Sequence, residues 1–127
     1  MCLDSRKGVK IANKNIGVYK VLFSNGETVF RNKEGVNNNK YKNNDFFDDM
    51  VKNKAIGFDE GFGFTVFRKK EVAKLYMNEV RRGYPFNFFI IIKEYKIPKG
   101  SKYEEGKIQE CFVGGDLVAI RCEELIK

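Results

Sequence analysis

The sequence predicts an α+β fold, in which a twisted, mainly antiparallel sheet of five or six strands packs on one principal helix. Three observations predict it. First, the apolar runs 16–23 and 28–31 flank Ser-Asn-Gly-Glu, and Asn-Gly between two apolar runs is typical of a β-hairpin, because both residues tolerate positive φ angles. Second, apolar residues recur at helical spacing over residues 69–82. Third, residues 86–97 form a long and largely apolar run, typical of a strand.

The chain around the hairpin is polar. Residues 1–15 are expected to form a polar N-terminal arm, followed by a single α+β domain over residues 16–127. Residues 32–45 contain almost no apolar side chains and predict an exposed loop. The apolar residues of segment 46–53 fall near helical spacing, which predicts a helix of one or two turns.

A strand followed by the principal helix is predicted in the middle of the chain. Residues 61–67 alternate between large apolar and small residues, which is typical of a strand. Helix 69–82 follows, with two arginines in its last turn and Gly83 suited to the position just after it. The apolar stripe expected on this helix consists of Val72, Leu75, Tyr76 and Val80.

The last third of the chain is expected to complete the sheet. Residues 86–97 are apolar on both faces in the first half and alternate in the second, which predicts a central strand that is covered by the helix on one side and emerges at one end. A closing hairpin is expected from residues 108–113 and 117–122 around Gly-Gly-Asp, which would place Cys111 opposite Ala119. The predicted core comprises Val18, Val21, Phe23, Phe64, Val66, Val72, Leu75, Tyr76, Phe89, Ile91, Phe112, Val118 and Ile120.

The sequence also predicts where in the cell the protein is located. The longest apolar run, residues 88–92, is far too short to span a bilayer, so no membrane partner is expected. The N-terminus has no apolar signal segment. An odd number of cysteines (Cys2, Cys111 and Cys122) without a secretion signal predicts reduced thiols and a cytoplasmic location.

The net charge and the absence of histidine limit the classes of function that the protein can have. The net charge is +7, with nine basic and four acidic residues among the first 45, which favours an anionic partner such as a nucleotide or nucleic acid. The competing interpretation is codon bias, since AT-rich codons supply Lys, Asn, Ile, Phe and Tyr. The absence of histidine excludes Ser-His-Asp and Cys-His catalytic arrangements and histidine metal ligands. No catalytic residue, cofactor or metal site is predicted.

One glycine and three basic clusters are the candidate binding residues. Gly61 and Gly63 form Gly-x-Gly, but Val66 and the strand-like segment around it break the dinucleotide-binding pattern. Gly63 is therefore expected either to permit close packing or to border a pocket. Basic residues beside aromatics are typical of nucleic-acid binding, and an anion would relieve the repulsion between cations at a helix start. The candidate anion- or partner-binding residues are Lys40, Tyr41, Lys42, Gly63, Arg68, Lys69, Lys70, Arg81 and Arg82.

Three segments resemble a group of small uncharacterised proteins of bacterial and phage genomes. They are KIANKNIGVYKVL at 10–22, EGFGFTVF at 60–67 and KEYKIPKGSKYEEG at 93–106. Members often have Gly-Phe-His where this chain has Gly-Phe-Gly at 61–63. The resemblance implies a phage or prophage setting, in which small basic proteins often inhibit a host defence protein or sequester a nucleotide signal.

A second similarity is to ADP-ribosyltransferase-like folds, which also place a Gly-aromatic strand before a helix and a long strand. Their catalytic glutamate arrangement is not matched, because Gln109 and Glu110 are adjacent here. The leading hypothesis is a non-enzymatic, phage-derived binding protein that inhibits a host nucleic-acid-handling or defence protein or sequesters an anionic nucleotide. The alternatives are a nucleotide-processing enzyme of the transferase-like kind and an assembly component of a particle.

Overall fold

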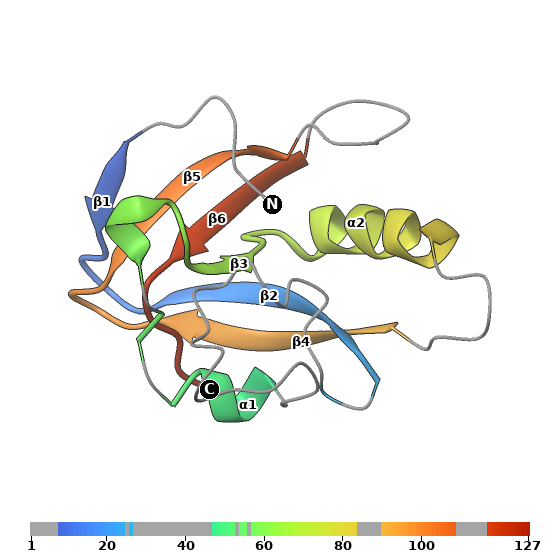
Figure 1. Ribbon diagram of the computed structural model, residues 1–127, viewed down its shortest axis with the longest axis horizontal. Helices are drawn as coiled ribbons and strands as arrows, with labels where there is room; N and C mark the ends of the chain where they lie inside the picture. Colours follow the sequence, from blue (N-terminus) through green and yellow to red (C-terminus); the bar gives the residue numbers. More distant parts are fainter. Residues whose placement is uncertain are drawn as a thin grey trace.

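The computed structural model describes residues 8–24, 26, 47–52, 54–55, 57–83, 90–108 and 117–127. It confirms the α+β class (Figure 1). The strands are β1 (Val9–Ile11), β2 (Ile16–Phe23), β3 (Phe64–Val66), β4 (Ile90–Ile97), β5 (Lys102–Ile108) and β6 (Leu117–Cys122). The helices are α1 (Phe47–Met50), the principal helix α2 (Lys70–Gly83) and a 3-10 turn at Phe58–Glu60. β1 lies within the segment expected to be a polar arm.

The strands form two antiparallel sheets. One has the order β1-β5-β6-β3, and the other is the pair β2-β4. The sheets meet where Tyr19 and Phe67 exchange two backbone hydrogen bonds, with N···O distances of 2.7 and 2.8 Å. On the far side of β4, Lys96 and Ile126 exchange two more, of 2.7 and 2.8 Å. In the described part of the chain, β4 therefore forms a ladder with β2 alone and a single bridge on its other side, so the expectation of a central strand is confirmed only at Lys96.

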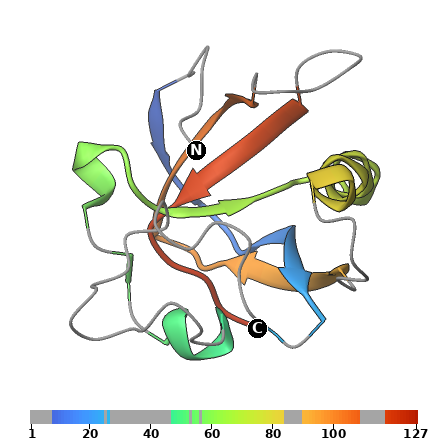
Figure 2. The ribbon, with the colours of Figure 1, turned by 45° about the vertical axis from the view of Figure 1, so that its right-hand side comes forward.

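The β2-β4 pair has two faces that are covered by different elements. Its register pairs Gly17 with Lys96, Tyr19 with Glu94, Val21 with Ile92 and Phe23 with Ile90. Because side chains alternate along a strand, these eight residues share one face, here called the helix face. α2 packs on it, whereas α1 lies on the opposite, inner face (Figures 1 and 2).

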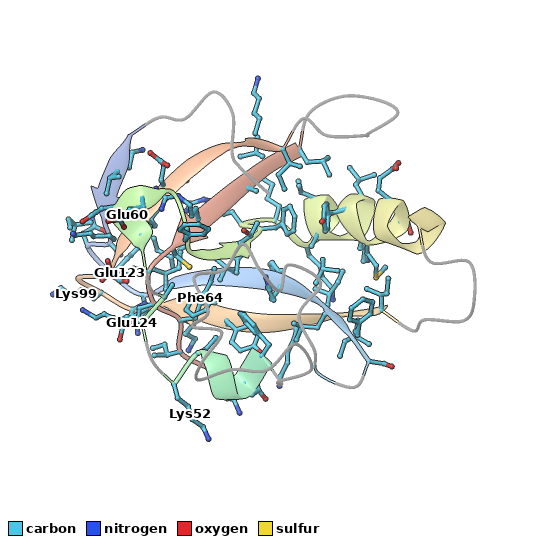
Figure 3. All side chains as sticks on the ribbon, viewed as in Figure 1. Lys52, Glu60, Phe64, Lys99, Glu123 and Glu124 are labelled. Atoms are coloured by element: carbon cyan, nitrogen blue, oxygen red, sulfur yellow. The ribbon has the colours of Figure 1, made fainter. Side chains whose placement is uncertain are left out.

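The hydrophobic core has one part on each face of the pair. Under α2, Ala73 and Tyr76 pack with Val21, Phe23 and Phe67. On the inner face, the Phe47 ring of α1 meets the rings of Phe64 and Tyr95 edge-on, at centroid distances of 5.5 and 5.4 Å. Figure 3 shows Phe64 pointing into this interior. The fully buried Lys20 donates a 2.9 Å hydrogen bond to the Thr65 carbonyl, and its ammonium lies 4.8 Å from the centre of the Phe47 ring.

Most of the predicted core is confirmed, but three predicted members are exposed. Leu75 is 55% exposed because the buried stripe of α2 is rotated toward Ala73, whose small side chain lets the helix approach the sheet. Val118 is 46% exposed, near the start of β6, where it pairs with the exposed Lys107. Ile91 is 40% exposed, near the start of β4. Val72 is half-buried, while Phe89 and Phe112 lie outside the described residues.

The closing hairpin exists, but its predicted register is wrong. Ala119 pairs with Gly106 rather than with Cys111, because the first strand is Lys102–Ile108 instead of 108–113. The segment Lys-Tyr-Glu-Glu-Gly-Lys-Ile is too polar to be read as a half-buried strand. It is a strand because Glu104 is buried opposite Arg121 of β6, and the two form an ion pair of 2.9 Å.

Other predictions are confirmed in part. The helix expected at 46–53 is the short α1, and the strand expected at 61–67 is reduced to β3. The helix expected at 69–82 begins and ends one residue later than expected. The return strand predicted at 28–31, the loop 32–45 and Cys111 lie outside the described residues. Cys122 is a buried cysteine that is not part of a disulfide, and its thiol contacts the Phe64 carbonyl oxygen.

Candidate functional site

A pocket of about 290 Å³ lies on the helix face of the β2-β4 pair. α2 covers the end of this face that carries Val21, Phe23 and Ile90, and leaves the other end open. The residues that line the pocket are Gly17, Val18, Tyr19, Arg68, Glu94, Tyr95, Lys96 and Lys127. The open end of this face therefore includes the second half of β4, a strand that was expected to emerge from the helix at one end.

Two backbone bridges position the segments that form the two sides of the pocket. The Tyr19–Phe67 bridge holds the chain after β3 beside β2 and brings Arg68 to one side. The Lys96–Ile126 bridge holds the C-terminal segment beside β4 and brings Lys127 to the other side. Segments from four distant parts of the sequence thus run side by side to form the site.

Gly17 leaves open space in the floor of the pocket because it has no side chain. A Cβ atom built on Gly17 meets no other atom within 4 Å, although this glycine lies in an eight-residue strand. Its φ angle is outside the left-handed region, so the backbone conformation does not require glycine. Directly opposite, Lys96 is exposed. The hollow therefore results from the missing side chain at position 17.

The cations around the pocket differ in how far their charge is compensated. One Nη of Arg68 donates to the Glu105 carboxylate of β5, but the guanidinium has five N–H donors in all. The Lys127 ammonium lies 3.2 Å from the Asp48 carboxylate. Lys96 has no ion-pair or hydrogen-bond partner for its side chain among the described residues. Lys96 is therefore the cation most available to an anion.

Asp48 of α1 contacts β4 and the C-terminal segment beside the pocket from the inner face of the β2-β4 pair. Its carboxylate accepts hydrogen bonds from Lys93 at 2.7 Å and from the Tyr95 hydroxyl at 2.6 Å, in addition to the Lys127 contact. Partial burial raises the pKa of Asp48, but the hydrogen bonds from Lys93, Tyr95 and Lys127 and the charge of Lys93 outweigh it. The pKa of Asp48 falls from 3.8 to about 2. The ionised carboxylate thereby ties β4 and the C-terminal wall of the pocket to α1.

Replacing Asp48 with asparagine is expected to lower the free energy of unfolding by about 1 kcal/mol at neutral pH, after allowance for solvent screening of this half-buried group. Because the folded pKa is below the unfolded pKa, the carboxylate stabilises the fold above about pH 4, and this contribution is lost as the pH falls toward 2. Urea denaturation between pH 2 and 7 measures it. Asp59→Asn is the control, since the Asp59 side chain is 76% exposed. Parallel pH profiles for the wild type and Asp48→Asn would contradict the role of Asp48.

The structure does not bring the predicted binding residues together in one site. Arg68 lines the pocket, whereas Lys69 and Lys70 are exposed at the start of α2 and are not among its lining residues. Lys40, Tyr41 and Lys42 lie outside the described residues, and of Arg81 and Arg82 only the helical backbone is described.

Gly63 lies apart from the pocket, in a polar cluster inside the fold. A Cβ atom there would lie 2.8 Å from Cγ of Arg121 and 2.9 Å from the Cys122 carbonyl oxygen. Arg121 donates to the carbonyl oxygens of Phe58 and Phe62 and lies 4.0 Å from the centre of the Phe58 ring. The contacts of Gly63 are thus packing contacts, and its neighbours fill the space beside it.

Sequence reasoning did not identify Gly17, Tyr19, Glu94 and Lys96 as site residues. Each belongs to a strand that was predicted correctly, but which residues share a face depends on the β2-β4 register. A signal was present in Gly17, an isolated glycine inside a strand pattern, which is typical of a close approach or a gap.

Comparisons of the chain with protein-family models, with curated proteins and with solved structures found no match. Within the described part of the chain, no helix has the length and apolar character needed to cross a membrane.

Proposed function

We propose that this protein is a small basic binding protein that captures a small anionic ligand in the pocket formed by Gly17, Arg68 and Lys96. The observation that carries the proposal is the position of Lys96, an exposed cation opposite a side-chain gap and across the pocket from Arg68. Both residues can donate charge-assisted hydrogen bonds, which are roughly twice as strong as neutral ones.

The surroundings of the pocket also favour a negative ligand. α2 begins two residues after Arg68, and the N-terminus of a helix carries a partial positive charge. The exposed Lys69 and Lys70 lie at that helix start. The net charge of +7 adds long-range attraction for anions.

The pocket favours capture of a small molecule over inhibition of a host protein. Small-molecule sites are concave and begin at about 300 Å³, and this pocket is close to that size. In the phage setting that the resemblance implies, such capture would withdraw an anionic signal from its host receptor. The enzymatic alternative calls for two converging carboxylates, whereas Glu94 is the one acidic side chain among the described residues that line the pocket.

Inorganic pyrophosphate is expected to bind the wild-type protein with an affinity that falls as salt is added. Lys96→Gln is expected to weaken this binding about tenfold, because it removes a charge-assisted hydrogen bond. Isothermal titration calorimetry measures both. Lys107→Gln is the matched control, because it removes the same charge from an exposed strand position outside the pocket.

Gly17→Val tests the location independently of charge. Valine suits a strand and meets open space at this position, so the fold should keep its stability or gain up to about 1 kcal/mol. The valine side chain would fill the hollow and abolish binding. Pyrophosphate binding that survives both Gly17→Val and Lys96→Gln would place the anion site elsewhere.

A further inference from the structure

We infer that the ligand of this pocket is a mononucleotide, an inference that rests on the proposed anion-binding function and specifies its ligand. The pocket combines two cations with an aromatic ring, Tyr19, and a carboxylate, Glu94. A phosphate, a base and a sugar hydroxyl or base amine are the chemical groups that match these three features.

The phosphate end is assigned to Arg68 and Lys96. They reach the pocket from different elements, Arg68 from the chain that follows β3 and Lys96 from β4. Glu105 holds one Nη of Arg68, which fixes the guanidinium in place and leaves other N–H groups for a ligand. A planar arginine fork and a lysine point charge together suit a phosphate dianion.

Tyr19 is placed to receive the base. Its side chain is half-buried, since one part packs against the core under α2 while the residue also lines the pocket. Tyr19 and Gly17 lie two residues apart on the same strand face, so the ring adjoins the hollow that Gly17 leaves open. A ring fixed in this way is a stacking surface, and aromatic side chains bind every base through its π-face.

Glu94 distinguishes a nucleotide from a simple polyanion. It lies opposite Tyr19 and two residues before Lys96, on the same strand face. A carboxylate at this place repels phosphate, but it accepts hydrogen bonds from ribose hydroxyls or from base amino groups, as acidic residues do in nucleotide sites. The volume of about 290 Å³ is at the lower end for ligand pockets, which favours a mononucleotide over a dinucleotide.

Calorimetric titrations of the full chain with adenosine monophosphate, uridine monophosphate, adenosine and pyrophosphate test the inference. Both nucleotides are expected to bind more tightly than adenosine and pyrophosphate. Tyr19→Leu keeps an apolar side chain against the core but removes the stacking surface, so it should weaken nucleotide binding about tenfold and pyrophosphate binding by clearly less. Glu94→Gln should strengthen pyrophosphate binding and reduce the preference for nucleotides over pyrophosphate.

The outcomes separate this inference from the function on which it rests. If pyrophosphate binds as tightly as the nucleotides, or if Tyr19→Leu weakens all ligands equally, the mononucleotide assignment is wrong while anion binding at the pocket stands. If no ligand binds, the proposed function fails as well. If Tyr19→Leu disturbs folding, the wild-type affinities for nucleotides, adenosine and pyrophosphate, together with those of Glu94→Gln, still test the mononucleotide assignment.

Discussion

Replacing Arg121 with methionine is expected to lower the free energy of unfolding by about 3–5 kcal/mol, which is typical of breaking a buried ion pair from one side. The side chains of Arg121 and Glu104 are each only 7% exposed. The substitution would leave Glu104 buried without its arginine and would remove the donor to the Phe58 and Phe62 carbonyl oxygens. Urea denaturation monitored by circular dichroism measures the loss.

The double variant Arg121→Met with Glu104→Met gives the control for this prediction. Replacing both members of a buried ion pair by apolar residues is often close to neutral, so the double variant should recover much of the lost stability. Recovery should be incomplete because the Phe58 and Phe62 carbonyl oxygens lose the Arg121 hydrogen bonds, although the Phe58 oxygen still accepts from the Gly61 N–H. The exposed pair of Lys102 and Asp59, at 3.8 Å, is the comparison, and Lys102→Met should cost less than about 1 kcal/mol. A similarly small loss for Arg121→Met would show that the ion pair does not hold β5 to β6.

Replacing Gly63 with valine is expected to destabilise the protein by about 2–5 kcal/mol, the sum of backbone strain and overpacking. The φ angle of Gly63 is +153°, which non-glycine residues rarely adopt. Its Cβ would clash with the Cys122 backbone carbonyl, which is not free to move because β6 is paired on both sides. Thermal and urea denaturation of the purified variant measure the effect.

Gly17→Val is the control for Gly63→Val, because the substitution is the same, whereas Gly17 is exposed within β2 and Gly63 is buried just before β3. Gly17 has open space and an ordinary φ angle, so the two variants are expected to separate stability from binding. Gly63→Val should lose stability, whereas Gly17→Val should lose ligand binding alone. A Gly63→Val protein of wild-type stability that no longer binds pyrophosphate would instead place Gly63 at the site.

Local sequence patterns were sufficient to predict the main elements. β2, β4 and α2 were predicted because each carries a long run of the right periodicity. β5 was missed because its burial depends on a cross-strand partner, since Glu104 is buried only where Arg121 of β6 lies opposite. Leu75 was misplaced because the size of Ala73, rather than the hydrophobicity of Leu75, decides which side of α2 approaches the sheet.

The candidate site was harder to predict than the fold. Arg68 was identified from its position in a basic run before a helix, and it does line the pocket. Its partner Lys96 is one of 18 lysines, and nothing local to it distinguishes it from the others. Only the register that sets Lys96 opposite Gly17, together with the bridges to Phe67 and Ile126, brings the site together. These are long-range pairings that no window of the sequence contains.

The most direct test of the proposed pocket is a two-dimensional amide NMR titration of the isotope-labelled protein with pyrophosphate. Saturable shift changes are expected at Gly17, Tyr19, Arg68 and Lys96, with smaller changes in the first turn of α2 and none of these in Gly17→Val. Changes confined to residues 40–42 or 81–82, or no saturable change at any amide, would contradict the proposal that this pocket binds anions.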